Sequence, residues 1–281
     1  MLGWLEGVVG KGARIVHCEP LQGGITASVD LVVLDHRGRS VELVLKRSTR
    51  GQAAEPRRAT EREVEVLELL KTAGVAAPRL VAANDSALLM TRLPGQVWLT
   101  PTDRRSWLGQ MASTLAQLHE VQPPGGMPAR ELEMRPVRTP LDSRRPGVWQ
   151  HVVELLERPA PVGGGLLHGD YQHFNLLWHR EQLSGVVDWT WAGIGHPDRD
   201  VGHCCLNLAV LFAPDWAKDF VAAYEAEAGR VTDAWWRAFQ LSRFGGDTWQ
   251  EFIPVQVAGR APVDASGMTA RVEDVLLDLI P

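Results

Sequence analysis

Cysteine and lysine are both scarce in this sequence, and each shortage is informative. The 281 residues include only three cysteines, Cys18, Cys204 and Cys205. Cys204 and Cys205 are adjacent and cannot easily bridge each other, so we expect no disulfide framework and a reducing, cytoplasmic location. Only 4 of the 29 basic residues are lysines. A lysine inside an apolar strand, such as Lys46, therefore stands out.

Long hydrophobic runs are also absent. The longest apolar stretch lies around 204–213 and is far too short to cross a bilayer. The start, Met-Leu-Gly-Trp-Leu-Glu, lacks the basic and then apolar pattern of a secretory signal. The net charge of −5 does not favour binding to nucleic acid. We therefore expect neither a membrane nor a nucleic acid as partner, and a monomer or homodimer with an ordinary core.

The charge is unevenly distributed along the chain. Residues 201–281 carry 11 acidic against 6 basic residues, which accounts for the acidic excess of the whole chain. Solvated helix faces explain such a bias most simply. The alternative is an acidic wall that binds a cationic substrate, for which the candidate residues are Asp215, Asp219, Glu225, Asp247 and Glu251.

The first part of the sequence predicts a small antiparallel sheet with one inserted helix. Apolar and β-branched runs separated by turn residues favour strands, whereas 57–73 repeats its apolar residues at helical spacing. The predicted strands are 14–20, 25–34, 41–46, 79–83 and 87–90.

The second part predicts a mainly helical region. Leu93-Pro94-Gly95 interrupts the pattern, so we place an N-terminal nucleotide-binding lobe at 1–92 and a C-terminal catalytic and substrate-binding lobe at 93–281. We expect helices at 103–120 and 147–157 and throughout the chain after residue 200, with short strands at 166–167, 176–178 and 185–187. The segment 123–146 is rich in Pro, Gly and Arg and is expected to be an ordered loop or a mobile insertion.

The segment His168-Gly-Asp170-Tyr-Gln-His-Phe-Asn175 carries the strongest chemical signal. Asp170 and Asn175 lie five residues apart between short apolar runs, and Asp188 follows thirteen residues later at a strand end. A kinase needs one carboxylate to accept the proton of the acceptor hydroxyl, and an Asn and an Asp to hold Mg²⁺. The alternative is that these residues only shape turns and cap helices.

This spacing matches the catalytic and metal loops of the protein-kinase superfamily. The His-Gly-Asp and Asp188-Trp189 versions resemble those of the aminoglycoside phosphotransferase and choline kinase-like family. The resemblance implies a bilobal α+β protein kinase-like fold that binds ATP, or GTP, with Mg²⁺. It also implies that Asp170 is the catalytic base and that Asn175 and Asp188 are the metal ligands.

The resemblance extends to the N-terminal part of the chain. Lys46 takes the place of the lysine that holds the α- and β-phosphates, and Glu63 that of its glutamate partner. Glu61 is a rival for the pair, because Thr60-Glu-Arg-Glu63 is also a capping-box pattern in which Glu63 would bond only backbone. Lys46 on its own could instead protect an edge strand.

Two further nucleotide contacts rest on the same resemblance. Gly23 and Gly24, between the first two strands, could let the backbone approach phosphate, although a plain hairpin turn explains them equally well. Thr91 and Leu93 correspond to the family's hinge, where the Thr91 carbonyl and the Leu93 amide would hold the adenine.

Two residues, His168 and Asp200, are assigned supporting roles, and a candidate zinc motif is assigned none. The resemblance makes His168 a structural residue beneath the catalytic loop and makes Asp200 a brace for that loop, although Asp200 could equally be a helix N-cap. His203-Cys204-Cys205 suggests a zinc site, but adjacent ligands lack the usual spacing, so buried helix residues are the favoured interpretation.

The expected activity is ATP-dependent phosphorylation of a hydroxyl on a small, cationic molecule. An antibiotic, either an aminoglycoside or a basic cyclic peptide, is the first choice, and a metabolic alcohol, namely choline, homoserine or a sugar-like acceptor, is the second. A catalytically inactive binding module is the alternative from another class, disfavoured by the intact set of site residues. The candidate acceptor contacts are Asp198, Trp191, Asp247 and Glu251.

Overall fold

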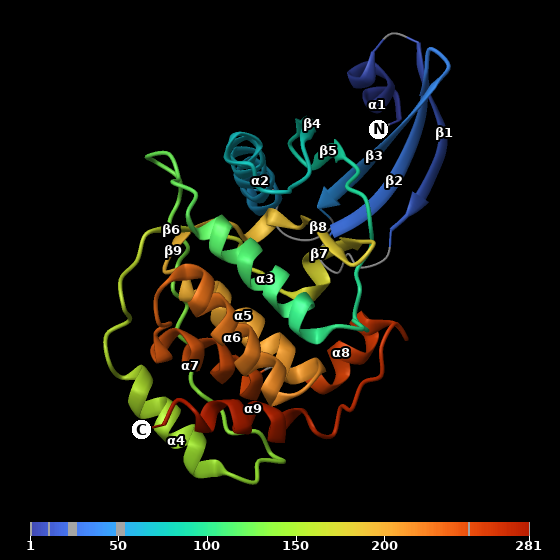
Figure 1. Cartoon of the computed structure of the whole chain (residues 1–281). Helices are drawn as coiled ribbons and strands as arrows, with labels where there is room; N and C mark the ends of the chain where they lie inside the picture. Colours follow the sequence, from blue (N-terminus) through green and yellow to red (C-terminus); the bar gives the residue numbers. More distant parts are fainter. Residues whose placement is uncertain (1, 11, 22–26, 49–53, 247, 281) are drawn as a thin grey trace.

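The computed structural model describes residues 2–10, 12–21, 27–48, 54–246 and 248–280. A sheet with two helices forms one end of the molecule, and a helical region forms the rest (Figure 1). None of the helices in these ranges is both long and apolar enough to cross a membrane. The elements of the sheet end are α1 (Leu2–Val9), β1 (Ala13–Pro20), β2 (Ala27–His36), β3 (Arg39–Ser48), α2 (Ala54–Ala73), β4 (Leu80–Asn84) and β5 (Ala87–Thr91).

The five strands form one antiparallel sheet in the order β1-β2-β3-β5-β4. Side chains alternate between the two faces of a strand, so β3 places Leu43 and Leu45 on one face and Lys46 on the other. Leu43 and Leu45 join a buried cluster with Leu5 of α1. The face that carries Lys46 is turned toward α2, so the lysine of β3 can meet a side chain of that helix.

The sequence predicted one helix in this region, and the residues that the structure describes here form two. Helix α1 was missed because Gly3 and Gly7 interrupt its short apolar run. Its Leu5 is fully buried against the sheet, so tertiary packing stabilises a segment with weak helix propensity of its own.

The helical region is built around α5, which is almost entirely buried. Among the 14 residues of α5, His203 alone is not buried. Its Gly202 lies against the backbone of α7, where an added Cβ would be 2.8 Å from the Trp236 carbonyl oxygen. The helices are α3 (Arg104–His119), α4 (Pro146–Leu156), α5 (Asp198–Leu211), α6 (Pro214–Ala228), α7 (Ala234–Ser242), α8 (Trp249–Val257) and α9 (Met268–Leu277).

Two short antiparallel pairs lie between the sheet and the helices. These are β6 (Gly165–Leu167) with β9 (Gly193–Gly195) and β7 (Leu176–His179) with β8 (Gln182–Val186). The tight 3-10 turns η1 (His173–Asn175) and η2 (Trp189–Trp191) follow the predicted site loops, and η3 (Arg243–Gly246) follows α7. The expected α+β kinase-like architecture is confirmed, and the lobe boundary after residue 92 stays a prediction.

The segment 123–146 contains no helix or strand before α4 begins at Pro146. It is attached to β9 by hydrogen bonds on both sides of Ile194, from Arg130 N to Ile194 O (2.7 Å) and from Ile194 N to Pro128 O (3.1 Å). Further along, Thr269 of α9 donates to Asp142 (2.7 Å). The segment therefore runs as an irregular chain that is bonded to the helical region at several points.

Candidate active site

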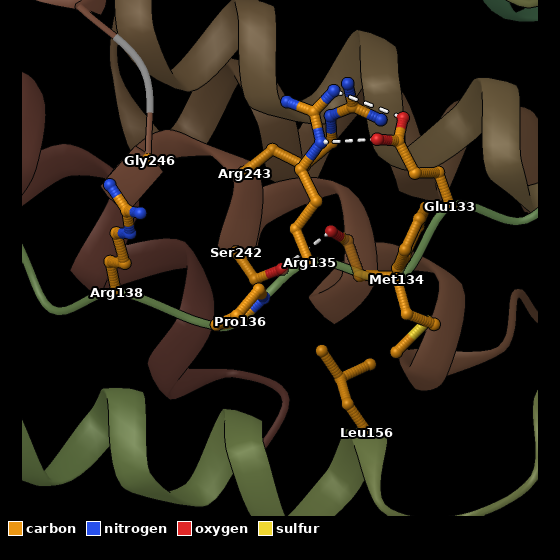
Figure 2. A pocket seen from close by; sticks show the side chains of 10 residues that line it. Glu133, Met134, Arg135, Pro136, Arg138, Leu156, Ser242, Arg243 and Gly246 are labelled. Carbon is orange, nitrogen blue, oxygen red and sulfur yellow. Dashed lines mark hydrogen bonds and ion pairs between the residues drawn. The ribbon is translucent and has the colours of Figure 1, made fainter.

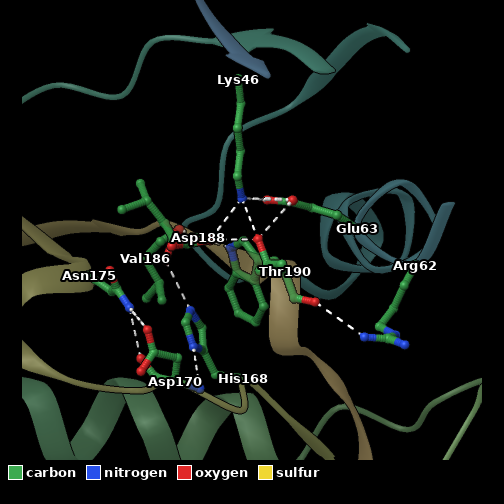
Figure 3. Close-up of polar contacts among 11 residues, drawn as sticks. Lys46, Arg62, Glu63, His168, Asp170, Asn175, Val186, Asp188 and Thr190 are labelled. Carbon is green, nitrogen blue, oxygen red and sulfur yellow. Dashed lines mark hydrogen bonds and ion pairs between the residues drawn. The ribbon is translucent and has the colours of Figure 1, made fainter. Parts of the chain in front are cut away.

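Lys46 and Glu63 form a buried ion pair between β3 and α2. The Lys46 Nζ atom donates to both carboxylate oxygens of Glu63 at 2.8 Å, and the two side chains are only 10% and 4% exposed (Figure 3). Glu61, the rival partner, is exposed. The structure thus joins Lys46 to Glu63, as predicted, while their role toward a nucleotide stays a prediction.

The same ammonium also contacts the strand end that carries Asp188. Lys46 Nζ lies 2.7 Å from Asp188 Oδ1 and 2.6 Å from the Thr190 hydroxyl oxygen, which in turn lies 2.7 Å from Asp188 Oδ1. Asp188 has a φ of 65°, a left-handed conformation that is costly for a residue with a side chain. Sequence reasoning missed Thr190, which follows the recognised Asp188-Trp189 pair.

These contacts keep both partners charged. Burial by itself would lower the pKa of Lys46, but the carboxylates of Glu63 and Asp188 raise it above its ordinary value. Burial likewise favours a raised pKa for Asp188, but the ammonium of Lys46 and the hydrogen bonds from Lys46 and Thr190 lower that pKa overall. The cluster therefore presents an ammonium and an ionised carboxylate, the groups that phosphate and a divalent cation need.

Asp170 lies in the loop after β6 and is fixed by three side chains. The Asn175 amide nitrogen donates to Asp170 Oδ2 at 2.8 Å and also to the Asp170 backbone oxygen. The Gln172 amide nitrogen lies 2.9 Å from Asp170 Oδ1, and His203 Nε2 lies 2.8 Å from the same oxygen. The Asp170 side chain stays 24% exposed, so its carboxylate is oriented but accessible.

Gln172 and His203 were missed by the sequence analysis as contacts of Asp170. A signal for His203 existed, because residues three apart on a helix lie on neighbouring positions of one face. Asp200 was already assigned to brace the loop, so His203 should lie one turn further along the same face. The pattern His203-Cys204-Cys205 drew attention to zinc instead, but Cys204 and Cys205 are buried in α5 among apolar side chains.

His168 links the two loops of the site. Its Nδ1 accepts a hydrogen bond from the Asp170 backbone N–H (3.2 Å), and its Nε2 lies 3.0 Å from the Val187 carbonyl oxygen. These partners require a neutral ring with the proton on Nε2. The fully buried His168 therefore holds the Asp170 loop against the strand end that carries Asp188.

Asp200 braces the same loop from α5. Its two carboxylate oxygens accept the backbone N–H groups of His168 (2.7 Å) and Gly169 (2.9 Å). Gly169 has a φ of +81°, and an added Cβ would lie 2.0 Å from the Trp191 carbonyl oxygen. Glycine is therefore required here both for its backbone conformation and for space.

Asn175 and Asp188 fit a magnesium site. Because the Asn175 amide nitrogen faces Asp170, its amide oxygen is turned away and has no hydrogen-bond partner among the described residues. The chain is bonded between the two segments, from Val187 N to Asn175 O at 2.9 Å. One amide oxygen and one carboxylate suit Mg²⁺, with the remaining positions left for phosphate and water. In the described ranges, no group of three His, Cys, Asp or Glu side chains forms a metal site.

The structure describes two of the four remaining residues that were predicted to contact the nucleotide. Thr91 ends β5, and its hydroxyl accepts the Arg79 N–H at 2.9 Å. Leu93 packs on Gly185 of β8, where an added Cβ would lie 2.3 Å from the Leu93 Cδ1 atom. Gly23 and Gly24 lie outside the described residues. The hinge contacts with adenine therefore stay predictions.

The candidate acceptor contacts are not brought together. Asp198 is fully buried, and its carboxylate binds Arg230 (2.6 Å) and the Asp233 N–H (2.7 Å), so a role in holding α5 against the α6–α7 connection replaces the expected substrate contact. Glu251 is exposed in the first turn of α8, and Asp247 lies outside the described residues. Trp191, which is 44% exposed, does lie at the catalytic loop through its carbonyl contact with Gly169.

Comparisons with known proteins agree with this fold. The chain resembles, over its full length, the macrolide 2'-phosphotransferase MphH from Brachybacterium faecium, with 19% identity, a TM-score of 0.58, and 100% and 99% of the two chains covered. LicA in complex with AMP gives 16% identity and a TM-score of 0.64, with 99% and 97% covered.

Curated relatives match only through a part of their length. The mouse acyl-CoA dehydrogenase family member 10 is 26% identical over 219 residues, which is 64% of this chain and 20% of that protein. The human acyl-CoA dehydrogenase family member 11 is 23% identical over 197 residues, or 58% of this chain and 25% of that protein. The model of the phosphotransferase enzyme family matches residues 17–236, so the chain belongs to that family.

Proposed function

We propose that the protein transfers the γ-phosphoryl group of Mg²⁺-bound ATP, or GTP, to a hydroxyl of a small molecule. The observation that carries this proposal is the joining of two half-sites through His168. One half holds Lys46, Glu63 and Asp188, and the other holds Asp170 with Asn175 (Figure 3). Solved relatives with ATP or ADP bound support the choice of nucleotide.

Each residue has a distinct task in the proposed reaction. Lys46 neutralises charge on the nucleotide phosphates, and Glu63 holds its ammonium in place. Asn175 and Asp188 supply the oxygen ligands for Mg²⁺, which when bound offsets the charge that develops on the transferred group. Asp170 orients the acceptor hydroxyl and accepts its proton. Catalysis depends mostly on positioning, because phosphoryl transfer needs little covalent help from the protein.

The solved relatives support a proposal for the class of acceptor, which is a small molecule. They include a macrolide phosphotransferase and complexes with gentamicin and hygromycin B, which supports an antibiotic as one candidate. A small metabolic alcohol is the other.

Three of the five acidic side chains considered for a cationic acceptor already have partners within the protein. Asp215 and Asp219 both bind Arg104, and Glu225 accepts hydrogen bonds from the Thr232 backbone N–H and hydroxyl. These carboxylates are engaged within the protein, so they do not form an open acidic wall.

The test is a panel assay with the purified protein, Mg²⁺ and ATP. Gentamicin, hygromycin B, a macrolide, choline and glycerol derivatives are compared by ADP release and by ³¹P NMR of the product. An ATP-dependent phosphate ester on any acceptor supports the proposal. If no acceptor stimulates turnover and Mg²⁺–ATP does not raise the melting temperature, a binding module without kinase activity is the better account.

A further inference from the structure

Four arginines from separate segments lie close enough together that the charges of three of them act on the fourth, Arg130, and two of the four contact the 190–191 segment. Arg62 lies on α2, Arg130 in the loop before α4, Arg199 on α5 and Arg243 at the start of η3. We refer to these four residues as the arginine cluster. These four residues are far apart in the sequence, and each carries a positive charge at neutral pH. The fold brings them near one another.

Two members of the arginine cluster touch the loop that flanks Asp170. Arg130 lies with its Cζ atom 5.1 Å from the ring centroid of Trp191, whose carbonyl oxygen packs against Gly169. Arg62 approaches the Thr190 carbonyl oxygen at 3.4 Å (Figure 3). The charge of the cluster is therefore directed at the segment that positions the catalytic carboxylate and the metal ligand.

The arginine cluster forms no direct ion pair with a carboxylate that the structure describes. Within the described ranges, no acidic side chain lies at ion-pair distance from any of its four guanidinium groups. Arg199 donates instead to the Arg130 backbone oxygen (3.3 Å), and the Arg130 Nε atom is buried without a hydrogen-bond partner. The carboxylate of Asp200, which accepts the backbone N–H groups of His168 and Gly169, offsets part of the positive charge, but the pKa of Arg130 and that of Arg199 are still lowered overall, by burial first.

The like charges act on one another. Burial first, and then the charges of Arg199, Arg62 and Arg243, lower the pKa of Arg130 to about 10. Such mutual repulsion between arginines is unfavourable in the free protein and is relieved when an anion binds.

A cavity of about 190 Å³ opens next to Arg243 (Figure 2). It lies between the 133–138 segment and the α7–η3 junction, with Met134, Leu156 and Phe239 as its apolar lining and Arg138 and Arg243 as cationic lining. Glu133 also lines it, but this carboxylate is paired with Arg135 (3.1 Å). The cavity therefore offers apolar surface at the edge of a positively charged region.

We propose that the arginine cluster binds an anionic group, a phosphate or a carboxylate, of the hydroxyl-bearing acceptor. This inference rests on the proposed phosphotransferase function and replaces a cationic acceptor with an anionic one. Arginine forks match the geometry of both oxyanions, and several forks together favour a group with more than one charged oxygen. The apolar cavity next to Arg243 accommodates the rest of the acceptor.

The first test measures anion binding without turnover. The full-length protein is saturated with ADP and Mg²⁺, so that phosphate cannot bind in place of the nucleotide, and is titrated with inorganic phosphate to 20 mM. We expect the melting temperature to rise by about 3 °C in the wild type and by less than about 1 °C in Arg243→Gln and Arg130→Gln. Arg158→Gln, an exposed arginine after α4, is the matched control and should respond like the wild type.

Phosphate also stabilises proteins in general, because it is excluded from their surfaces, and this part of the rise should be equal in all variants. The difference between the control and the two cluster variants therefore reports only binding at the arginine cluster. An equal rise in the wild type and in both cluster variants would overturn the inference. Failure of ADP and Mg²⁺ to raise the melting temperature would count against the proposed function instead. The titration needs no turnover, so it decides the inference even when no tested acceptor is a substrate.

The second test asks whether the arginine cluster binds the acceptor rather than the nucleotide. Glycerol 3-phosphate, glycerate, glycerol and choline are compared as acceptors. We expect kcat/KM to be at least 10-fold higher for an anionic acceptor than for glycerol or choline. Whether glycerol 3-phosphate or glycerate has the higher kcat/KM shows whether the cluster prefers a phosphate or a carboxylate. Arg130→Lys and Arg130→Gln should raise the KM of that acceptor, the second more strongly, and leave the KM of ATP within about twofold. Preference for choline, or a rise confined to the KM of ATP, would contradict the inference.

Discussion

The ammonium of Lys46 lies 2.8 Å from each carboxylate oxygen of Glu63, in an ion pair that is almost completely shielded from water. The pair ties β3 to α2 and holds Lys46 where it also reaches Asp188. Breaking a buried pair by removing one partner leaves the other charge uncompensated, so the arrangement should be sensitive to single substitutions.

Lys46→Met should lower the free energy of unfolding by roughly 3–5 kcal/mol, because Glu63 and Asp188 would then face each other without a cation. Urea denaturation measures the change. Arg92→Met is the control, since the pair of Arg92 with Glu42 is exposed and should contribute less than about 1 kcal/mol. Adding Glu63→Gln to Lys46→Met should recover part of the loss. Equal effects of Lys46→Met and Arg92→Met would show that the buried pair is not important for stability.

Gly169→Ala should destabilise the catalytic loop far more than a positive φ alone explains. The new methyl group would meet the Trp191 carbonyl oxygen at 2.0 Å. Gly38→Ala is a matched control, because Gly38 has a similar φ of +76° and no atom within 4 Å of an added Cβ. We expect a loss of about 1 kcal/mol for Gly38→Ala and more than about 3 kcal/mol for Gly169→Ala in thermal and urea unfolding. Similar losses for both would rule out the close contact.

His203→Phe should reduce kcat about 10-fold or more, because Asp170 would lose a polar contact at 2.8 Å that helps to orient its carboxylate. His203→Gln keeps a polar side chain beside Asp170 and should retain more activity. Steady-state kinetics with the best acceptor of the panel measure both variants, with exposed His151→Gln as the control. If His203→Phe and His151→Gln have the same kcat, the contact with Asp170 does not contribute to the reaction.

Only one cysteine should react in the native protein. Burial raises the pKa of the Cys205 thiol to about 12 and that of Cys204 well above its ordinary value. A raised pKa leaves little of the reactive thiolate at pH 8, whereas Cys18 is exposed. A chromogenic disulfide reagent should therefore label one thiol at pH 8 and three in guanidinium chloride, and Cys18→Ser should abolish the native signal. Rapid native labelling of two thiols would contradict the packing of α5.

The architecture was predictable because it depends on local patterns. Alternation and helical periodicity correctly predicted the sheet strands and α2, but α1 was missed because its stability comes from packing on the sheet. The short β9 was also missed, since two of its three residues, Gly193 and Gly195, disfavour strands and the segment pairs with β6 only in the folded chain.

The site was predictable only where residue spacing is diagnostic. Asp170, Asn175 and Asp188 form a motif with a diagnostic spacing. Thr190 and Gln172 belong to no such motif, and only their contacts with Lys46 and Asp170 show that they are part of the site. The acidic residues after position 200 illustrate the opposite case. Asp215 and Asp219 pair with Arg104, which is 111 and 115 residues away, so their neutralisation could not be inferred from local sequence.

The most direct test of the central claim compares Asp170→Asn with Asp188→Asn for nucleotide binding and phosphoryl transfer. Binding is followed by the melting temperature with Mg²⁺ and ATP, and transfer by release of ADP with the best acceptor. We predict that Asp170→Asn binds Mg²⁺–ATP like the wild type but loses at least about 100-fold in kcat, whereas Asp188→Asn loses the Mg²⁺-dependent part of binding as well. Wild-type turnover in Asp170→Asn would contradict the account.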